Sequence, residues 1–366
     1  MFSAADHDFM ARALRLAELG LYTTTPNPRV GCLIVNKGVV VGAGWHHSAG
    51  APHAEINALQ AAGAAARGAT VYVSLEPCSH HGRTPPCAQA LIAAGVRRVI
   101  AAMQDPNPQV AGGGLALLQA ASIACECGLL EAEARELNIG FVARMTRGRP
   151  WVRVKIAASL DGKTALANGL SQWITGPAAR LDGQRWRARA CAILSGIGTL
   201  RTDDPQLNVR AVETSRQPLK VVVDSRLELP PQGKVLNGGG VLLASASAAS
   251  ERGAALRARG AEILCLPNAA GQVDLAALLA ELGRREINEV HVEAGSRLNG
   301  ALLAAGLVDE LLLYLAPCLI GNAARGLFDL PALESLQDKQ RVTIHDARMV
   351  GGDLRLLARF ANAELK

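Results

Sequence analysis

The feature that most constrains this chain is a histidine and a glutamate two residues apart, followed by two cysteines. They are His53 and Glu55, then Cys78 directly after a proline, then Cys87. One imidazole and two thiolates can hold a zinc ion and leave its fourth position open for water, which distinguishes a catalytic zinc site from a closed structural one. Any fold of this chain must therefore bring residues 53, 78 and 87 around one ion.

Glu55 indicates what such a site would do. It can face a water on the metal without being a ligand, and can carry protons while zinc lowers the pKa of that water. H-x-E followed by P-C-x-x-C is the signature of the zinc deaminases. The alternative is a closed zinc knuckle, which would need a fourth ligand at regular spacing and gives no reason for Glu55. The motif therefore favours a hydrolytic site with three metal ligands and Glu55 as the proton carrier.

The chain departs from the general signature between its two cysteines, where residues 79–86 stand in place of two residues. This insertion is polar, cationic and stiffened by two prolines. Because Arg and His side chains suit phosphate, we interpret it as a lip over the pocket that holds an anionic part of the substrate. An ordinary surface loop is the alternative.

Composition limits the partners. At 366 residues the chain is long enough for about two domains, each with its own core. The net charge of +6, from 38 Lys and Arg against 32 Asp and Glu, can attract phosphate-bearing ligands. Nucleic acid is the rival explanation, but single-strand binding needs clustered aromatic side chains, and aromatics are only 3% of this chain and scattered. We therefore expect a small anionic substrate and no nucleic acid.

The cysteines and apolar runs indicate the compartment. Eight cysteines are too few for a disulfide scaffold in a chain of this length, and Cys32, Cys191, Cys265 and Cys318 lie in apolar runs that predict buried thiols. The N-terminus lacks the long apolar core of a signal peptide, and the longest apolar run, near residues 311–320, is too short to span a bilayer. We expect a cytoplasmic protein with no membrane association.

The first part of the chain predicts a three-layer α/β domain, because strands alternate with helices. We expect helices near residues 6–19, 54–59, 88–94, 115–120 and 130–142, and strands near residues 30–35, 39–41, 70–75, 98–103 and 123–127. The loop at residues 25–31 holds two prolines and cannot be helical. It is either a substrate wall, with Asn27 offering a donor and an acceptor, or an ordinary turn.

A basic segment broken by Gly and Pro, residues 145–150, predicts a domain boundary, with domains at 1–147 and 148–366. The second domain is again α/β, with predicted strands near residues 151–158, 219–224, 240–244, 263–266 and 289–293. No G-x-G-x-x-G follows its first strand, which argues against an ordinary dinucleotide fold. Glycines after two strands, at 196–198 and 295, can expose backbone amides for phosphate, although any tight turn can carry a glycine.

Three segments together resemble a known family. HAE at residues 53–55, LEPCSHHGRTPPC at 75–87 and QDPNP at 104–108 resemble the bifunctional pyrimidine deaminase/reductases of riboflavin biosynthesis, over nearly the whole chain. The long insertion is itself characteristic of that family. The resemblance implies a cytidine-deaminase-like N-terminal domain that hydrolyses 2,5-diamino-6-(5-phosphoribosylamino)pyrimidin-4(3H)-one. It also implies a dihydrofolate-reductase-like C-terminal domain that uses NADPH to reduce 5-amino-6-(5-phosphoribosylamino)uracil to the ribityl product.

The same resemblance implies the residues of both sites and a homo-oligomer. The Zn2+ ligands would be His53, Cys78 and Cys87, with Glu55 as the catalytic residue. The contacts to NADPH would be Ala157, Trp173, Thr199, Asp203, Ser225, Gly295, Ser296, Arg297, Leu298, Asn299, Gly300 and Ala301. The contacts to the phosphoribosylated pyrimidine substrate would be Ser171, Arg187, Leu207, Arg210 and Glu293. Two arginines suit a phosphate and a carboxylate can orient hydroxyls, although Arg187 could instead be a helix-surface charge.

Two other readings of the sequence stay open at this point. One is a nucleic-acid or free-base deaminase with an unrelated second domain. The other is a noncatalytic binding module that zinc stabilises.

Overall fold

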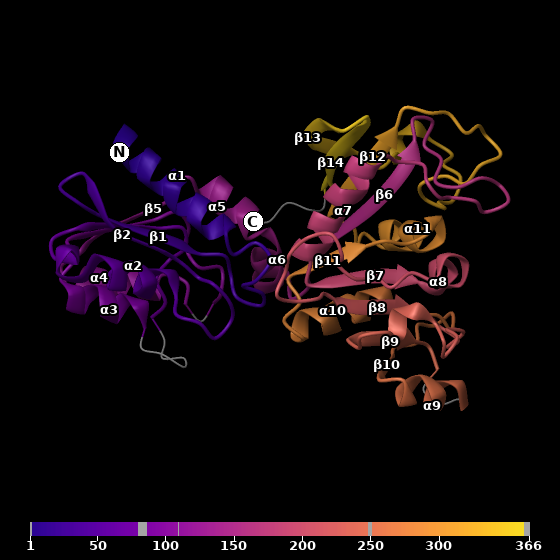
Figure 1. Cartoon of the computed structure of the whole chain (residues 1–366), viewed down its shortest axis with the longest axis horizontal. Coiled ribbons are helices and arrows are strands. Elements are labelled where there is room, and N and C mark those ends of the chain that lie inside the picture. Colours follow the sequence, from indigo (N-terminus) through magenta and orange to yellow (C-terminus); the bar gives the residue numbers. More distant parts are fainter. Residues whose placement is uncertain (1, 80–85, 109, 248–250, 362–366) are drawn as a thin grey trace. The chain divides into compact units, whose positions relative to one another are not determined.

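The computed structural model describes residues 2–79, 86–108, 110–247 and 251–361, and the chain forms two compact units (Figure 1). The first unit is Met1–Arg147 and the second is Gly148–Lys366. Each has its own sheet and its own core of buried aliphatic side chains. Among the described residues, no helix combines the length and the apolar character that crossing a bilayer requires.

The described residues of the first unit form a five-stranded sheet with the order β2-β1-β3-β4-β5. Its strands are β1 (Gly31–Asn36), β2 (Val39–Trp45), β3 (Thr70–Val73), β4 (Arg98–Ala101) and β5 (Ala124–Cys127). β1 runs antiparallel to β2 and to β3, whereas β3, β4 and β5 are parallel. Short parallel strands that alternate with helices need helices on both faces, and the unit has them.

Helices cover both faces of this sheet, so the predicted three-layer α/β class is confirmed (Figure 1). α1 (Ala4–Glu18) and α5 (Glu131–Leu137) lie on one face. α2 (Ala54–Ala62), α3 (Cys87–Ala94) and α4 (Gly113–Ala120) lie on the other, and the 3-10 turn η1 (Gly63–Ala66) follows α2.

Glycines in the strands let two of these helices approach the sheet closely. A Cβ on Gly31 would lie 2.0 Å from the carbonyl oxygen of Ala13 in α1, and one on Gly44 would lie 2.5 Å from that of Ala54 in α2. Only glycine permits such an approach of main chain to main chain. The start of α2, where the zinc motif begins, is therefore held directly against β2.

The single helix predicted for residues 130–142 is wrong, because the chain breaks at Asn138 into α5 and α6 (Ile139–Arg147). The Asn138 side chain accepts a hydrogen bond from the Arg29 N–H (2.8 Å) and donates one to the Arg29 carbonyl (3.0 Å). An asparagine that binds backbone groups elsewhere in the fold competes with continuation of the helix. Sequence periodicity cannot show a partner so far away in the chain.

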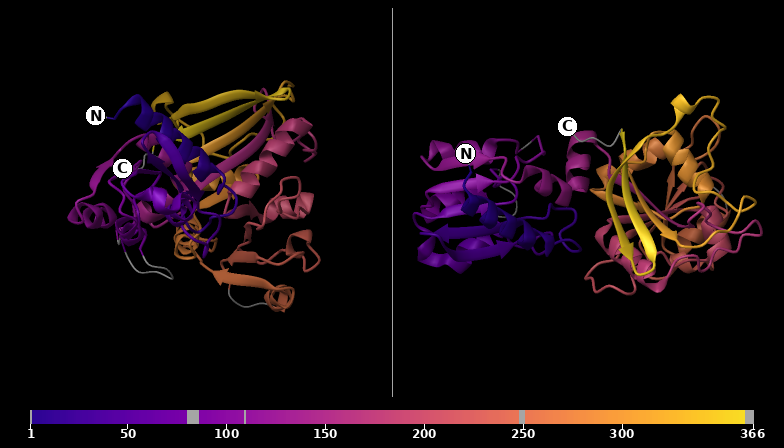
Figure 2. Two further views of the ribbon diagram at one scale, coloured as in Figure 1. Left: turned by 60° about the vertical axis from the view of Figure 1, so that its left-hand side comes forward. Right: turned by 90° about the horizontal axis from the view of Figure 1, so that it is seen from above.

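The described residues of the second unit form a nine-stranded sheet with the order β10-β9-β8-β7-β11-β6-β12-β14-β13. The strands are β6 (Trp151–Ser159), β7 (Ala192–Gly196), β8 (Leu219–Val223), β9 (Val241–Ser245), β10 (Ala261–Cys265), β11 (Glu289–Val292), β12 (Glu310–Ala316), β13 (Val342–Val350) and β14 (Asp353–Phe360). Neighbours from β10 to β12 are parallel, and β14 and β13 are added antiparallel. The second α/β prediction is confirmed, with β13 as an edge strand beside β14 (Figure 2).

The helical segments of the second unit mostly connect its parallel strands. They are α7 (Pro177–Arg189), α8 (Ile197–Asp203), η2 (Lys234–Leu236), α9 (Glu251–Ala258), α10 (Leu275–Arg284), α11 (Ser296–Ala304) and η3 (Leu336–Asp338). The largest core cluster contains Val154, Leu194, Val221, Leu278 and Val292, which come from four strands and α10.

Whether a cysteine is buried depends on its position in the fold rather than on whether its neighbours in sequence are apolar. Cys32 and Cys191 are buried as predicted, but the prediction is wrong for Cys265 and Cys318, which are exposed. Cys265 is the last residue of the edge strand β10, and Cys318 follows the end of β12. An edge strand or the loop beyond a strand end can leave a side chain in solvent even when the neighbouring residues are apolar.

Candidate active sites

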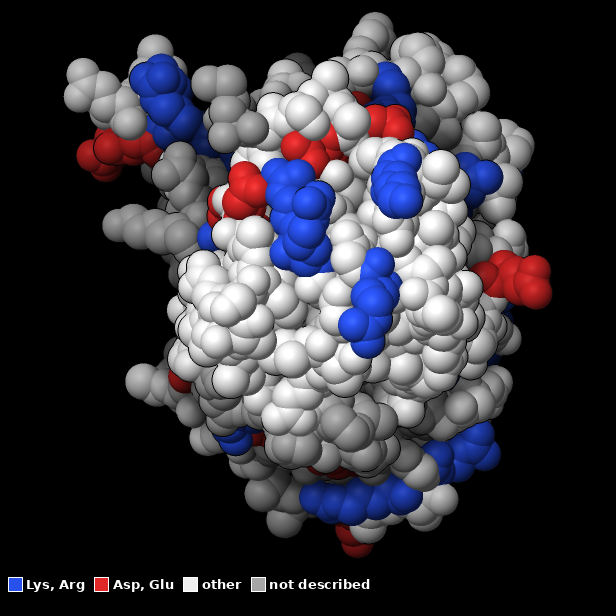
Figure 3. Space-filling model, turned by 90° about the vertical axis from the view of Figure 1, so that its left-hand side faces the viewer, with Lys and Arg blue, Asp and Glu red and all other residues white. Residues whose placement is uncertain are grey.

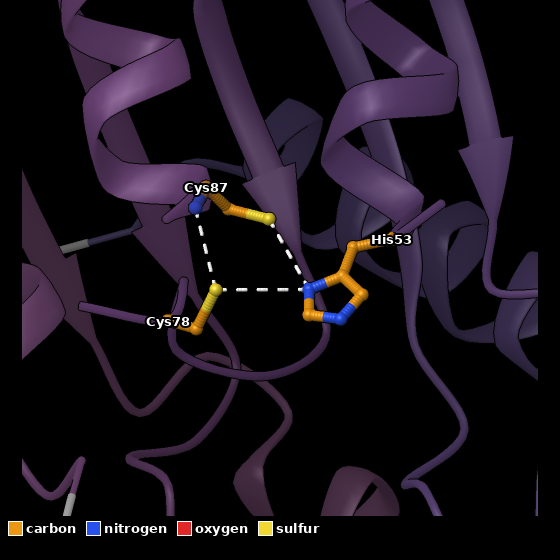
Figure 4. A group of neighbouring side chains, drawn as sticks. All are labelled: His53, Cys78 and Cys87. Carbon is orange, nitrogen blue, oxygen red and sulfur yellow. Dashed lines mark hydrogen bonds between the residues drawn. The ribbon is translucent and has the colours of Figure 1, made fainter. Parts of the chain in front are cut away.

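The three residues predicted to bind zinc lie together in the first unit (Figure 4). His53 Nδ1 is 3.3 Å from Cys87 Sγ and 3.6 Å from Cys78 Sγ, and their candidate ligand atoms all lie within 4.8 Å of one another. A tetrahedral zinc ion with ordinary Zn–S and Zn–N bonds places its sulfur and nitrogen ligands about 3.6 Å apart. The residues present therefore fit a zinc ion.

Two of these ligands lie at the N-termini of helices. His53 is the N-cap of α2 and Cys87 is the first residue of α3. The Cys87 N–H donates to Cys78 Sγ (3.3 Å), and hydrogen bonds from the Cys87 thiol and from His53 lower the pKa of Cys78, whereas the same thiol–thiolate bond and burial raise the pKa of Cys87. Helix N-termini and hydrogen-bond donors favour the thiolate, which is the form that binds metal.

Glu55 lies in the first turn of α2, buried to 3% exposure and outside the group of ligand atoms. Burial raises the pKa of Glu55 to about 7, against the opposing effect of His53. A carboxyl group that titrates near neutrality can both accept and release a proton during turnover. The geometry therefore gives Glu55 the properties of a proton carrier.

His46 is a site residue that no sequence motif singles out. It is buried and lies edge-on to His53, with ring centroids 5.4 Å apart. His46 Nδ1 is 3.1 Å from the Pro52 carbonyl oxygen, and Nε2 is 3.0 Å from Asn27 Nδ2. Because a carbonyl only accepts, Nδ1 carries the ring proton and Nε2 accepts from Asn27. This pairing fixes the side chain of Asn27.

The insertion predicted to form a lip lies outside the described residues, apart from Ser79 and Pro86 at its ends.

A cleft of about 1940 Å³ lies in the second unit. It is lined by residues at the carboxyl ends of β6, β7, β8 and β11, the edge at which open parallel sheets bind their ligands. Pockets for one small ligand have volumes of about 300–1,000 Å³. The cleft therefore has room for a dinucleotide and a second ligand together.

All five residues predicted to contact the reductase substrate line this cleft, as do ten of the twelve predicted to contact NADPH. The two that do not line it are Asn299 and Gly300. Asn299 is buried and donates to the Ala294 carbonyl (3.2 Å), and a Cβ on Gly300 would lie 2.0 Å from the Asp329 carbonyl oxygen. These two residues shape the start of α11, whereas Gly295, its N-cap, lies on the cleft.

Arg187 and Glu293, both predicted to bind substrate, bind each other. Arg187 Nε and Nη2 donate to the two oxygens of Glu293 at 2.5 and 2.7 Å, and Nη1 donates to the Asn208 carbonyl at 3.0 Å. Burial alone would raise the pKa of Glu293, but the charge of Arg187 and its hydrogen bonds hold that pKa well below its usual value. Glu293 is therefore an ionised carboxylate at the cleft wall.

Lys155 is a cleft residue that sequence reasoning missed. It lies on β6 among residues 151–158, where Val154 and Ile156 face the core. Alternation in a strand therefore places Lys155 on the same side as Ala157, and this pattern could have found it. Burial lowers the pKa of Lys155, while Glu293 acts in the opposite direction.

Known protein families match both units. A family model described as the cytidine and deoxycytidylate deaminase zinc-binding region matches residues 3–103. A second, described as the RibD C-terminal domain, matches residues 150–353.

Individual proteins match nearly the whole chain. It is 50% identical over 363 residues to the riboflavin biosynthesis protein RibD of Escherichia coli K12, covering 96% of this chain and 98% of that protein. It is 47% identical to RibD of Haemophilus influenzae, with 97% of each chain covered. Among solved structures, Acinetobacter baumannii RibD, form 1, is 42% identical with a TM-score of 0.91, covering 98% of this chain and 99% of that one. The diaminohydroxyphosphoribosylaminopyrimidine deaminase/5-amino-6-(5-phosphoribosylamino)uracil reductase of Thermotoga maritima is 30% identical with a TM-score of 0.87, at the same coverage.

Proposed function

Because the chain belongs to the RibD family, whose members carry a deaminase and a reductase of riboflavin biosynthesis on one polypeptide, we propose that each activity uses the residues placed above. The chain is a zinc-dependent hydrolase through its first unit and an NADPH-dependent oxidoreductase through its second. Its proposed substrates are the two compounds after which the Thermotoga maritima relative is named. The first is the phosphoribosylated diaminopyrimidine, and the second is the aminouracil formed from it.

In the first unit, His53, Cys78 and Cys87 would hold zinc, which when bound makes a water molecule nucleophilic at neutral pH. Replacement of an exocyclic amino group by oxygen releases ammonia, so protons must move from the attacking water to the ring nitrogen and the leaving nitrogen. Glu55 is the buried group beside the ligands that can move them. Asn27, held by His46, would orient the pyrimidine.

In the second unit, Gly295 and the backbone at the start of α11 would bind phosphate of NADPH, which supplies a hydride when bound. Reduction at C1 of the ribosyl chain would form a C1–H bond with that hydride and break the bond from C1 to the ring oxygen, and that oxygen would take a proton from solvent to give the ribityl product. Glu293 would orient the ribosyl hydroxyls, and Arg187 would hold Glu293 in place. Arg210, whose guanidinium binds no other described residue, would bind the ribose phosphate.

The observation that carries this proposal is the convergence of three zinc-type ligands beside a buried carboxyl that is not one of them. The test incubates the zinc-loaded full-length chain with the diaminopyrimidine ribotide and follows ammonia release, then NADPH oxidation. We expect ammonia first and NADPH oxidation only after it. NADPH oxidation without prior ammonia release, or ammonia release that persists without metal, would contradict the proposal.

A nucleic-acid deaminase is the second candidate that the sequence left open. On the face of the molecule in Figure 3, Lys and Arg side chains of the described residues lie in separate patches among neutral ones. A continuous basic band is the usual footprint of a polynucleotide partner. Turnover of the free ribotide, with no competition from single-stranded DNA or RNA, would decide for the small substrate.

The chain would also assemble with copies of itself in the cytoplasm. β13 is an edge strand with exposed apolar side chains, including Ile344 (60%) and Met349 (63%), and such edges readily pair. Ile344→Lys should lower the mass measured by light scattering, and an unchanged oligomer would exclude this edge. Thiolate ligands and exposed thiols such as Cys265 suit a reducing compartment, which cell fractionation would test.

A further inference from the structure

The carboxylate of Glu76, two residues before Cys78, is buried to 3% exposure and accepts four backbone hydrogen bonds. Oε2 accepts from the N–H groups of Asp105 (3.1 Å) and Gly112 (2.9 Å), and Oε1 accepts from those of Gly114 (2.9 Å) and Leu115 (3.2 Å). Most of these donors lie at the start of α4, where N–H groups have no partner within the helix. Glu76 therefore ties the zinc-motif segment to the first turn of α4.

The segment that follows Glu76 is held on two sides. A Cβ on Gly114 would lie 1.8 Å from the Pro77 carbonyl oxygen, so Pro77 packs directly on the backbone of α4. On the other side, the Cys78 carbonyl accepts from the Ala88 N–H (3.2 Å) in α3. Cys78 thus lies between α3 and α4, and the hydrogen bonds of Glu76 hold it to α4.

We propose that Glu76 is a positioning residue of the deaminase site, which fixes the direction in which Cys78 Sγ points toward the metal. Glu76 acts through the backbone and does not touch the substrate. This inference rests on the proposed role of Cys78 as a zinc ligand. Removal of groups that orient a metal ligand typically weakens metal binding about 10-fold to 100-fold.

The chemistry of a carboxylate explains why an amide should not replace it. Both oxygens of Glu76 accept, whereas a glutamine would turn an NH₂ group toward two backbone N–H donors. Glu76→Gln is nearly isosteric and disrupts half of the contacts without leaving a cavity. It therefore tests the hydrogen bonds rather than the packing.

The experiment measures transfer of zinc from the full-length chain to an excess of a chromophoric chelator. We expect Glu76→Gln to release zinc about 10-fold to 100-fold faster than the parent chain. Cobalt in place of zinc provides a second measurement, because the absorption of thiolate-bound cobalt reports ligand geometry. We expect that spectrum to change in Glu76→Gln. NADPH oxidation with the deaminated substrate should stay at the parent rate, because the second unit is unaltered.

Asp6→Asn is the matched control. Asp6 is another buried carboxylate of the same unit, but it lies in the first turn of α1, on the opposite face of the sheet. It accepts hydrogen bonds from Ser3, Tyr72 and Arg98. This variant should lower the melting temperature and leave zinc release within about twofold of the parent, since distant sites act independently.

Two results would overturn the proposal. In one, Glu76→Gln releases zinc at the parent rate with an unchanged cobalt spectrum. In the other, Glu76→Gln and Asp6→Asn release zinc faster in proportion to their losses of melting temperature, which would make Glu76 a stabilising residue only. If Glu76→Gln does not fold, Glu76→Asp keeps the charge with a shorter reach, and parent-like zinc release by it would contradict the proposal. Cys78→Ser that still holds zinc like the parent would instead reject the ligand set, which is a separate failure.

Discussion

Arg187 donates to both oxygens of Glu293, at 2.5 and 2.7 Å, and its remaining terminal nitrogen donates to the carbonyl of Asn208. The guanidinium therefore has partners on all three nitrogens before a substrate arrives. The function of Arg187 follows from these hydrogen bonds. Arg187 keeps Glu293 charged and oriented at the wall of the cleft.

Arg187→Met should lower the free energy of unfolding by about 1–3 kcal/mol, because it removes the main partner of the partly buried Glu293 carboxylate. It should also lower the reductase kcat more than it raises KM. In the parent, Arg187 holds the pKa of Glu293 well below its usual value, so Glu293 stays charged into the acid range. Without Arg187 burial raises that pKa, and reductase activity should fall at a higher pH as the medium is acidified. The pH profile of kcat measures this shift.

Arg185→Met is the control for Arg187→Met, since Arg185 is exposed on the same helix. It should leave both the pH profile and the melting temperature unchanged. If the acid limb of Arg187→Met coincides with that of the parent, Arg187 does not set the charge of Glu293.

Arg210→Ala should raise the reductase KM about 10-fold to 100-fold, because a hydrogen bond to a charged group contributes about 1.5–3 kcal/mol. The change in kcat should be small, since the phosphate is remote from the reacting carbon. The same assay with substrate that lacks the phosphate is the control. A penalty of equal size on the dephosphorylated substrate would remove Arg210 from the phosphate site.

Glu55→Gln should keep its zinc and lose ammonia release by about 10²-fold to 10⁴-fold, the usual contribution of a general acid–base group. NADPH oxidation with the deaminated substrate should continue at the parent rate. Metal analysis and the two activity assays on one preparation measure all three quantities. Deamination at the parent rate would show that another group carries the protons.

Removal of zinc by a chelator should abolish ammonia release and leave NADPH oxidation unchanged. Zinc ligation and hydride transfer are assigned to separate units of the chain. Readdition of zinc should restore ammonia release in proportion to the metal bound. A parallel loss of NADPH oxidation would mean that the second site also depends on the metal.

Asp6→Asn should destabilise the first unit by about 2 kcal/mol near neutral pH. Burial raises the pKa of Asp6, but hydrogen bonds from Ser3, Tyr72 and Arg98 outweigh it and leave that pKa below its usual value. Stability from such a group is present above its unfolded pKa of about 3.9 and is lost as the pH falls toward the folded value. The difference between parent and variant should therefore shrink below about pH 4. Urea titrations followed by far-ultraviolet circular dichroism at each pH measure it, and a difference that is constant with pH would contradict this account.

The residues of the zinc site could be predicted from the sequence because their chemistry depends on residue type and short spacing. His53 and Glu55 are neighbours on one helix turn, and two cysteines near a proline complete a known signature. The alternation of strands and helices likewise indicated the α/β class of both units. The reductase residues came from family resemblance rather than from spacing, and most of them line one cleft.

The remaining features depend on contacts between distant segments. Glu76 binds backbone groups 29 to 39 residues away, and Asn138 binds the backbone of Arg29 across 109 residues. Arg187 and Glu293 are 106 residues apart. No local pattern marks such partners, because any buried carboxylate or amide can satisfy its hydrogen bonds in several ways. The break after α5 and the hydrogen bonds of Arg187 therefore follow from the three-dimensional fold and not from any local pattern.

The glycines of β1 and β2 place α1 and α2 on the sheet without intervening side chains. The start of α2, which carries His53, therefore packs on main-chain atoms of β2 rather than on side chains. A methyl group added at Gly44 would clash with the backbone of α2 and push the helix, and with it the His53 imidazole, away from the sheet.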